Sequence, residues 1–334
     1  MRYLLEIKNL VVQYLTDQGI IHALNGVNLH LKRGEILGIA GETGSGKTTL
    51  ALAILRLLPQ NAKIVDGKII FDGTDLLSIP EEHMLNIRQE RISLILQGTS
   101  NALNPSMLAG WQVAEAIEYH NGVPLDEAFR RVKELFHDVE LGTRTIISLP
   151  HELSIGMRQK VKIALAISTK PDLIVADEPF IGLDPPMQLL MAFLLKRLHD
   201  KYGFSILIAS HNLSRMAEIC DYMAIIYAGE ILEYNTPYNI FNYPIHPYTK
   251  GLIGAIPRLK YIKRRLISMP GSPPSALNPP KGCKFWPRCP YAKDICKEKR
   301  PPLININGGL VACHFADKLK DLSPWDFWNK ESTQ

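Results

Sequence analysis

The chain of 334 residues has no long hydrophobic run. Apolar stretches such as Ile92–Leu96 and Leu173–Ala176 fall far short of the ~20 consecutive apolar residues that span a bilayer. The segment Met1–Glu6 reaches an acidic side chain before any long apolar stretch has formed, so it does not resemble a secretory signal. We therefore expect a protein that stays in the cytosol or reaches a membrane through a partner.

Cysteine is scarce and unevenly placed. Of the five cysteines, Cys220 stands alone, whereas the other four lie within 31 residues: Cys283, Cys289, Cys296 and Cys313. In a chain expected in the cytosol, such a group is more typical of a metal site than of disulfides.

Acidic residues are scarce in one segment of the chain. Between Arg258 and Arg300 there are 12 basic residues and two acids, so this segment carries +10 and the remainder −5 within a net charge of +5. The excess could face nucleic acid, anionic lipid or a cluster of negative charge. The run 258–265 within it is more typical of a solvated face.

Short apolar runs alternate with longer segments of helical periodicity through residues 1–257. The expected strands are Ile36–Ala40, Ile92–Leu96, Leu173–Ala176 and Ile206–Ala209. The expected helices include Leu50–Leu58, Arg158–Ser168 and Leu189–Leu198. This alternation predicts a mainly parallel sheet with helices on its faces.

Other segments predict different structure. Leu4–Tyr14, His22–Leu31 and Lys63–Phe71, the last with a turn at Asp66-Gly67, are typical of antiparallel hairpins. Residues 103–150 are mainly of helical character. Prolines punctuate the chain after Ile256, where periodicity is lost. We expect a domain over residues 1–257 and a C-terminal extension over 258–334.

Residues 41–48 carry the most specific chemical motif. The stretch Gly41-Glu42-Thr43-Gly44-Ser45-Gly46-Lys47-Thr48 matches G-x-x-x-x-G-K-[ST], with an expected strand before it and a helix beginning near Thr49 after it. The glycines let backbone N–H groups turn toward phosphates, and the helix N-terminus adds its dipole. We expect Lys47 to reach the β- and γ-phosphates of ATP, and the Thr48 hydroxyl to bind Mg²⁺.

A second acidic element follows a buried type of strand. Asp177 and Glu178 come directly after the apolar run Leu173–Ala176. Alone, such a pair is usually a solvated strand end. In a chain with a phosphate loop, Asp177 suits Mg²⁺ and Glu178 suits the polarisation of the attacking water.

These motifs together resemble those of ABC-type ATPase subunits over nearly the whole chain. The matching elements are Leu153-Ser154-Ile155-Gly156-Met157-Arg158-Gln159 for the signature, Gln97 for the Q-loop, Gly182-Leu183-Asp184 for the D-loop, His211 for the switch histidine and Tyr14 for the ring against adenine. The resemblance implies an α/β P-loop NTPase fold. Its parts would be a mainly parallel RecA-like sheet, an antiparallel β subdomain and a helical subdomain at about residues 98–168.

The resemblance also implies a mechanism in which two ATPase subunits close head to tail. Ser154 and Gly156 would then contact the ATP held by the partner. Lys47, Gln97, Glu178 and His211 would be the catalytic residues, with Gln97 also near Mg²⁺. Gln97 and the stretch 98–150 would couple closure to membrane subunits.

Position 155 departs from the family pattern, because Ile stands where the family usually has Gly. If the backbone there needs φ > 0, a β-branched residue fits poorly and the partner's ATP site is affected. If the position has ordinary helical-entry geometry, Ile is tolerated.

The four clustered cysteines are spaced Cys283-x₅-Cys289-x₆-Cys296-x₁₆-Cys313. Structural zinc sites usually bring ligands in close C-x₂₋₄-C pairs, which are missing here. Wide spacing suits a [4Fe–4S] cluster, whose negative charge the neighbouring basic side chains would offset. Zinc and free thiols are the alternatives.

The cysteine segment and three further stretches resemble one branch of the family, the importers of dipeptides and oligopeptides. The three stretches are Tyr243–Leu252 with its H-P-Y-T-x-x-L pattern, Pro270-Gly271-x-Pro273-Pro274, and Leu103-Asn104-Pro105. The resemblance implies an ATPase subunit peripheral to the cytoplasmic face of the membrane. Its partners would be a second ATPase subunit in a heterodimer, two transmembrane permease subunits and, indirectly, an extracytoplasmic peptide-binding protein, with no nucleic acid. A nickel or metal-chelate importer is the alternative.

Functions of other classes fit less well. DNA-maintenance ATPases insert long coiled coils between phosphate loop and signature, but only residues 49–152 separate the two here and no heptad run occurs. Translation-associated ATPases with paired cassettes are excluded by the single cassette. A redox or metal-sensing role for the cysteine segment stays open.

Overall fold

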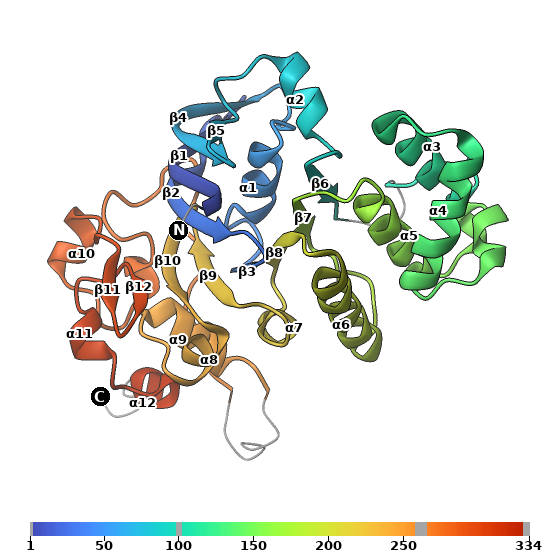
Figure 1. The fold of residues 1–334 in the computed structure, drawn as a ribbon. Coiled ribbons are helices and arrows are strands. Elements are labelled where there is room, and N and C mark those ends of the chain that lie inside the picture. Colours follow the sequence, from blue (N-terminus) through green and yellow to red (C-terminus); the bar gives the residue numbers. More distant parts are fainter. Residues whose placement is uncertain (1–2, 98–101, 258–265, 330–334) are drawn as a thin grey trace.

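The computed structural model describes residues 3–97, 102–257 and 266–329. Figure 1 shows the sheets and helix α1 in the middle, an arm of helices on one side and the C-terminal elements on the other. The basic run 258–265 and the first residues after Gln97 lie outside the described residues.

The smaller sheet is antiparallel and has the strand order β2-β1-β4-β5. Its strands are β1 (Tyr3–Thr16), β2 (Gly19–Lys32), β4 (Ala62–Phe71) and β5 (Thr74–Asp75). The three expected antiparallel segments therefore pair as predicted. The turn at Asp66-Gly67 was wrong: both residues lie inside β4, where the register against β1 shifts and Gly67 takes φ +102°. The Asp-Gly pair makes an irregularity in a continuous strand because a positive φ suits a bulge as well as a turn.

The larger sheet has the order β11-β12-β10-β9-β3-β8-β7-β6. Its strands are β3 (Ile36–Ala40), β6 (Ile92–Ile95), β7 (Leu173–Asp177), β8 (Ser205–Ser210), β9 (Tyr222–Tyr227), β10 (Glu230–Asn235), β11 (Ile304–Ile306) and β12 (Gly309–Val311). The pairs from β9 through β3, β8 and β7 to β6 are parallel, and those beyond β9 are antiparallel. Strands β3, β7 and β8 are buried along their whole length, which explains their unbroken apolar runs.

Helices cover the sheets and form the arm. They are α1 (Lys47–Ile54), α2 (Glu81–Ile87), α3 (Ala109–Asn121), α4 (Leu125–Asp138), α5 (Ile155–Ile167), α6 (Pro185–Tyr202), α7 (Leu213–Ala217), α8 (Pro237–Asn242), α9 (Pro247–Gly254), α10 (Asp294–Glu298), α11 (Ala316–Leu319) and α12 (Pro324–Asn329). Leu50 of α1 shares one hydrophobic core with Leu10 of the small sheet and Leu207 of the large sheet. Helix α1 therefore lies between the two sheets, where it can hold the loop before it in place.

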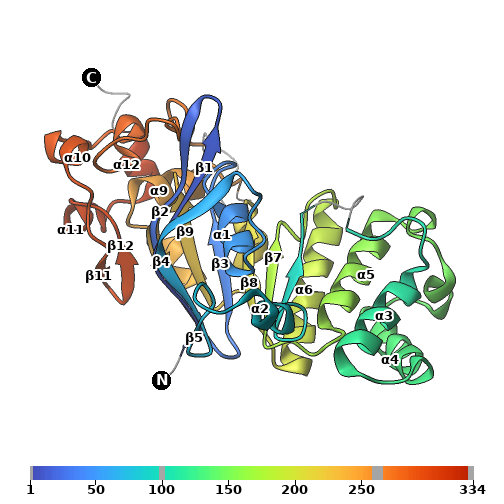
Figure 2. The ribbon, with the colours of Figure 1, turned by 90° about the horizontal axis from the view of Figure 1, so that it is seen from above.

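Helices α3, α4 and α5 lie together at one end of the molecule, and the red C-terminal elements lie at the other (Figure 2). Strand β12 pairs with β10, so the C-terminal extension continues the large sheet. No helix among the described residues is long and apolar enough to cross a membrane.

Candidate functional site

The loop Gly41–Gly46 connects the buried strand β3 to helix α1. Gly46 is the residue before the helix and has φ +106°, and an added Cβ there would stand 2.8 Å from the carbonyl oxygen of Ala23. Glycine is therefore required at this position both for conformation and for space. The Ser45 hydroxyl is buried and has no hydrogen-bond partner among the described residues. A buried unpaired donor beside a helix N-terminus suits an anionic ligand.

Lys47 is the first residue of α1, and its side chain turns back along the loop. Its Nζ donates to the carbonyl oxygens of Gly41, at 2.9 Å, and Glu42, at 3.0 Å. Burial lowers the pKa of Lys47, while the nearby carboxylates of Glu178 and Asp177 oppose that change. The ammonium group is thus held by carbonyl groups that a phosphate could replace as acceptors.

Asp177 ends strand β7 and is 1% exposed. Neither of its carboxylate oxygens has a hydrogen bond of ordinary geometry among the described residues. Burial raises the pKa of Asp177 and the Glu178 charge raises it further, whereas the Thr48 hydroxyl and Lys47 lie near enough to lower it. A buried carboxylate without a full set of partners, close to a threonine hydroxyl, is a donor set that fits Mg²⁺.

Glu178 follows Asp177 with φ +47°, which directs its side chain toward the end of strand β8. Its carboxylate accepts hydrogen bonds from the Ser210 hydroxyl and from the backbone N–H of His211, both at 2.9 Å. The His211 ring Nδ1 also lies 2.9 Å from the same carboxylate. Neighbouring parallel strands thus bring Glu178 and His211 together at one edge of the sheet, where the phosphate loop also lies.

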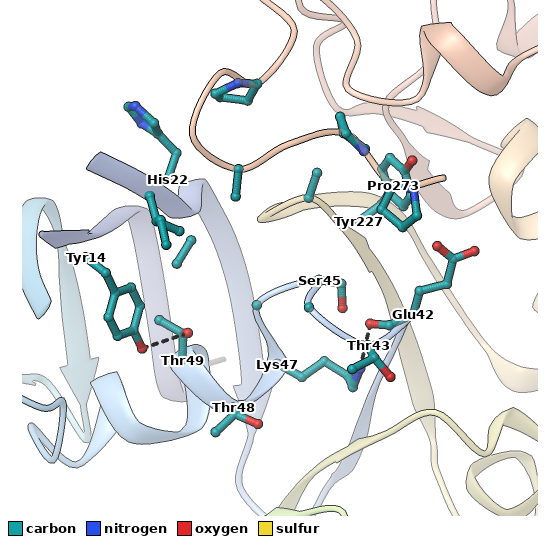
Figure 3. A pocket seen from close by; sticks show the side chains of 18 of the residues that line it. Tyr14, His22, Glu42, Thr43, Ser45, Lys47, Thr48, Thr49, Tyr227 and Pro273 are labelled. Carbon is teal, nitrogen blue, oxygen red and sulfur yellow. Dashed lines mark hydrogen bonds between the residues drawn. The ribbon is translucent and has the colours of Figure 1, made fainter. Parts of the chain in front are cut away.

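A cavity of about 490 Å³ joins these parts. It is lined by Tyr14, all residues from Glu42 to Thr49, Gln97, Glu178 and His211. Figure 3 shows Tyr14 and His22 toward one end of the cavity and Lys47 and Glu42 toward the other. The Tyr14 hydroxyl and the Thr49 hydroxyl are 3.0 Å apart. The cavity therefore offers an aromatic ring at one end and groups that can bind phosphate at the other.

One wall of the cavity was missed in the sequence. Pro273, Pro274, Ser275, Ala276 and Pro279 of the C-terminal extension line it. The carbonyl oxygen of Ala276 accepts a hydrogen bond from the backbone N–H of His22 at 2.9 Å. The run of prolines indicated an irregular, extended segment, but no local pattern indicates what such a segment covers.

The signature residues lie elsewhere. Ser154 caps helix α5, and its hydroxyl accepts a hydrogen bond from the Met157 N–H at 3.2 Å. Ser154 and Gly156 do not line the cavity around the phosphate loop. Ile155 is the first residue of α5 and has no positive φ, so its β-branched side chain strains no backbone. Position 155 therefore has the ordinary geometry of a helix entry, the second of the two alternatives considered for it, and tolerates Ile.

The four clustered cysteines surround one small cavity, together with Phe285, Trp286 and other side chains. This cavity has room of about 20 Å³, which is space for about one water molecule. Burial raises the pKa of Cys283 and of Cys289 to about 12, so these thiols stay protonated at neutral pH unless a cation binds them. In the described part of the chain, no three His, Cys, Asp or Glu side chains are already spaced to hold a metal ion.

Two family models match this chain. The model described as ABC transporter matches residues 24–181, which include the phosphate loop, the signature and the Asp177-Glu178 pair. The model described as oligopeptide/dipeptide transporter, C-terminal region, matches residues 232–296. The second match includes three of the four clustered cysteines.

Relatives of known name match nearly end to end. The oligopeptide transport ATP-binding protein OppD of Haemophilus influenzae is 40% identical over 92% of this chain and 96% of its own. The dipeptide transport ATP-binding protein DppD of Caldanaerobacter subterraneus subsp. tengcongensis is 36% identical over 96% of this chain and 100% of its own. Among solved structures, the dimeric post-hydrolysis state of the ATP-binding cassette MJ0796 with ADP and Pi is 27% identical. It has a TM-score of 0.63 over 70% of this chain and 98% of its own. The predicted fold is thereby confirmed.

Proposed function

Because this chain belongs to the ATP-binding subunits of the oligopeptide and dipeptide ABC transporters, we propose that it hydrolyses ATP to power peptide import across a membrane. The observation that carries this proposal is the cavity that joins the phosphate loop to Glu178 and His211. Oligopeptide and dipeptide transport are the functions named for the relatives, which favours a peptide over the nickel alternative.

We assign the steps of hydrolysis to side chains of this cavity. The Ser45 hydroxyl, the N–H groups of the loop and Lys47 bind the phosphates, and Tyr14 stacks on the adenine. Thr48, Asp177 and Gln97 would hold Mg²⁺, which neutralises charge on the phosphates. Glu178 accepts a proton from the attacking water, and His211, whose ring contacts Glu178, orients that carboxylate.

Activity of the purified protein and transport by the assembled complex test this function. The protein should release phosphate from ATP in a Mg²⁺-dependent way, and Lys47→Ala should abolish this. Lys196→Ala, which removes a partly buried lysine paired with Asp200, is the matched control and should keep full activity. In vesicles with the permease subunits, ATP-dependent uptake of a dipeptide or oligopeptide is expected. Uptake of nickel without peptide would refute the assigned cargo.

We propose that each ATP-binding site is completed by residues of a second ATPase subunit, and that the two subunits form a heterodimer. Ser154 and Gly156 are placed away from the cavity of their own chain, and Ser154 lies at a helix N-terminus that suits an anion from outside. The solved cassette that this chain resembles is dimeric. Light scattering on Glu178→Gln mixed with the second ATPase subunit should show a dimer with ATP and monomers without it. The dimer should form only after the second subunit is added.

We propose that the arm of α3, α4 and α5 contacts the permease at the cytoplasmic face of the membrane. Tyr119 and Ile147 on this part of the chain are 82% and 70% exposed. Burial of these apolar side chains against the permease would contribute to the affinity of the contact. Cross-linking from position 147 to a permease subunit would support this contact, and none in an active complex would contradict it.

We propose that Cys283, Cys289, Cys296 and Cys313 hold a [4Fe–4S] cluster, in an extension that begins near residue 258. The shared cavity of these four cysteines supports four-thiolate ligation. The loops must move apart on loading, since the cavity has room of only about 20 Å³. Anaerobic preparations should contain about four irons and four sulfides per chain, and Cys289→Ser should lose them. Zinc in place of iron would favour the alternative, and no metal at all would leave free thiols.

A further inference from the structure

Arg288 of the C-terminal extension reaches the phosphate loop. Its guanidinium nitrogens Nη1 and Nη2 lie 2.9 Å and 3.3 Å from the two carboxylate oxygens of Glu42. The two residues are 246 positions apart in the sequence. The Arg288 side chain is only 6% exposed, so this is a two-pronged ion pair that solvent screens little.

The guanidinium is held on its other sides as well. Its Nε donates to the carbonyl oxygen of Pro270 at 2.9 Å, and Nη1 also lies 3.3 Å from the Tyr227 hydroxyl. Its central carbon lies 5.8 Å from the ring centres of both Tyr227 and Phe285. The position of Arg288 is therefore set by the extension and by strand β9, independently of the loop it contacts.

Glu42 is tied into the loop by its backbone. Its N–H donates to the Tyr248 hydroxyl at 2.9 Å, and its carbonyl oxygen accepts from Lys47 Nζ at 3.0 Å and from the Ser45 N–H at 3.2 Å. A shift of the Glu42 side chain would therefore also move Lys47 and Ser45, which face the cavity. Glu42 also brings a negative charge to a loop whose ligand is a polyanion.

We propose that Arg288 is a positioning residue of the nucleotide site, which neutralises Glu42 and holds the phosphate loop in its binding geometry. Arg288 does not line the cavity around the phosphate loop, so it acts through Glu42. Loss of its charge leaves a half-buried carboxylate beside the phosphates, and the repulsion grows with each phosphate that the ligand carries. This inference rests on the proposed ATP function of the loop.

The test is Arg288→Met, which keeps the apolar stem between Tyr227 and Phe285 while it removes the charge. Binding of ATP, ADP and AMP is measured by titration calorimetry on the full chain. We expect the Kd for ATP to rise on the order of 10-fold, with a smaller rise for ADP and the smallest for AMP. In steady-state hydrolysis KM should rise while kcat stays within about twofold, because the chemical groups are untouched.

Rescue separates this role from a merely structural one. Glu42→Gln added to Arg288→Met should recover most of the lost ATP affinity, because the uncompensated charge is removed. Arg288→Lys should bind ATP with intermediate affinity, since one ammonium cannot engage both oxygens. If Arg288→Met does not fold, the ATP affinity of Arg288→Lys is compared with that of wild type. A weaker affinity would support the inference, and an equal affinity would overturn it.

The control is Arg300→Ala, a basic residue of the same extension that pairs with Glu230 at 3.3 Å. Its ATP affinity should equal that of wild type. A folded Arg288→Met protein with unchanged ATP affinity, or with an equal loss for ATP and AMP, would overturn the inference. Failure of the wild-type chain to bind ATP would instead refute the proposed function.

Discussion

Asp177→Asn should make the protein more stable and its nucleotide site weaker. Asp177 is buried, and neither carboxylate oxygen has a hydrogen bond of ordinary geometry among the described residues. An unsatisfied buried polar group costs about 1–3 kcal/mol of folding free energy. Asn has almost the same shape without the charge, so the substitution should recover part of that cost. Each kcal/mol shifts Tm by about 2–4 °C in domains of 150–250 residues and by less in longer chains. We expect a rise in Tm of about 2–5 °C without nucleotide.

Lys47 does not reverse this expectation. Its charge favours the ionised form of Asp177, yet burial and the Glu178 carboxylate outweigh it, so the pKa of Asp177 is raised on balance. A raised pKa means that folding favours the protonated carboxyl. Its stabilising contribution is present at pH below the ordinary pKa of Asp and is lost as the pH rises through the higher folded-state pKa. In Asp177→Asn this part of the pH dependence of stability should be missing.

The assay is differential scanning calorimetry with and without Mg²⁺ and ATP. A ligand at 100 times its Kd stabilises the native state by about 2.7 kcal/mol, and Asp177→Asn should gain much less because its Mg²⁺ ligand is gone. The Tm order of the two proteins should therefore reverse on addition of Mg²⁺ and ATP.

Asp172→Asn is the matched control, at the position directly before the same strand. Asp172 is fully paired: its Oδ2 lies 2.6 Å from Arg91 Nη2, and Arg33 binds its other oxygen. Loss of these ion pairs should lower the Tm of the protein without nucleotide. The rise in Tm on addition of Mg²⁺ and ATP should be unchanged. A lower Tm for Asp177→Asn without nucleotide would refute the reasoning, since it would show that the carboxylate stabilises the empty site.

Substitutions at three further positions have distinct expected results. Glu178→Gln should keep ATP affinity within a few-fold while turnover in a phosphate-release assay falls about 10²–10⁴-fold, the share of a general base; retained turnover would remove Glu178 from that role. Gly46→Ala should abolish ATP binding in calorimetry, because its Cβ would lie 2.8 Å from the Ala23 carbonyl oxygen; wild-type affinity would show that the loop adapts. Tyr14→Phe should keep most ATP affinity, since only the contact with Thr49 is lost, whereas Tyr14→Ala should lose about 1–3 kcal/mol of stacking; equal effects would argue against a ring on adenine.

The sheet and its phosphate loop were predictable because their signals are local. The strand Ile36–Ala40 was predicted with the same bounds that the structure has, since a fully buried parallel strand is a continuous apolar run. The motif at Gly41–Thr48 needs only a strand before it and a helix after it, and both are present. Helix α1 begins at Lys47, before the predicted start at Thr49 or Leu50, because its polar first turn is part of the loop and carries no apolar periodicity.

The parts that were missed depend on contacts between distant segments. The pairing of β12 with β10 joins two short strands about 75 residues apart, and strands of three residues show no alternation to recognise. The ion pair of Arg288 with Glu42 has no sequence pattern at all, because the geometry comes from the extension folding back over β9. Asp66-Gly67 misled because a positive φ serves a bulge as readily as a turn.

The pairing of β12 with β10 has a consequence for how this protein can change. If the chain ended after residue 257, strand β10 would become the edge of the large sheet, with its outer N–H and C=O groups unpaired. An exposed edge of this kind invites pairing with other chains and aggregation. The three-residue strand β11 now forms that edge and is too short to offer much of a template. The C-terminal extension therefore protects the edge of the sheet, so its loss in evolution or by proteolysis would lower solubility as well as remove one wall of the nucleotide cavity.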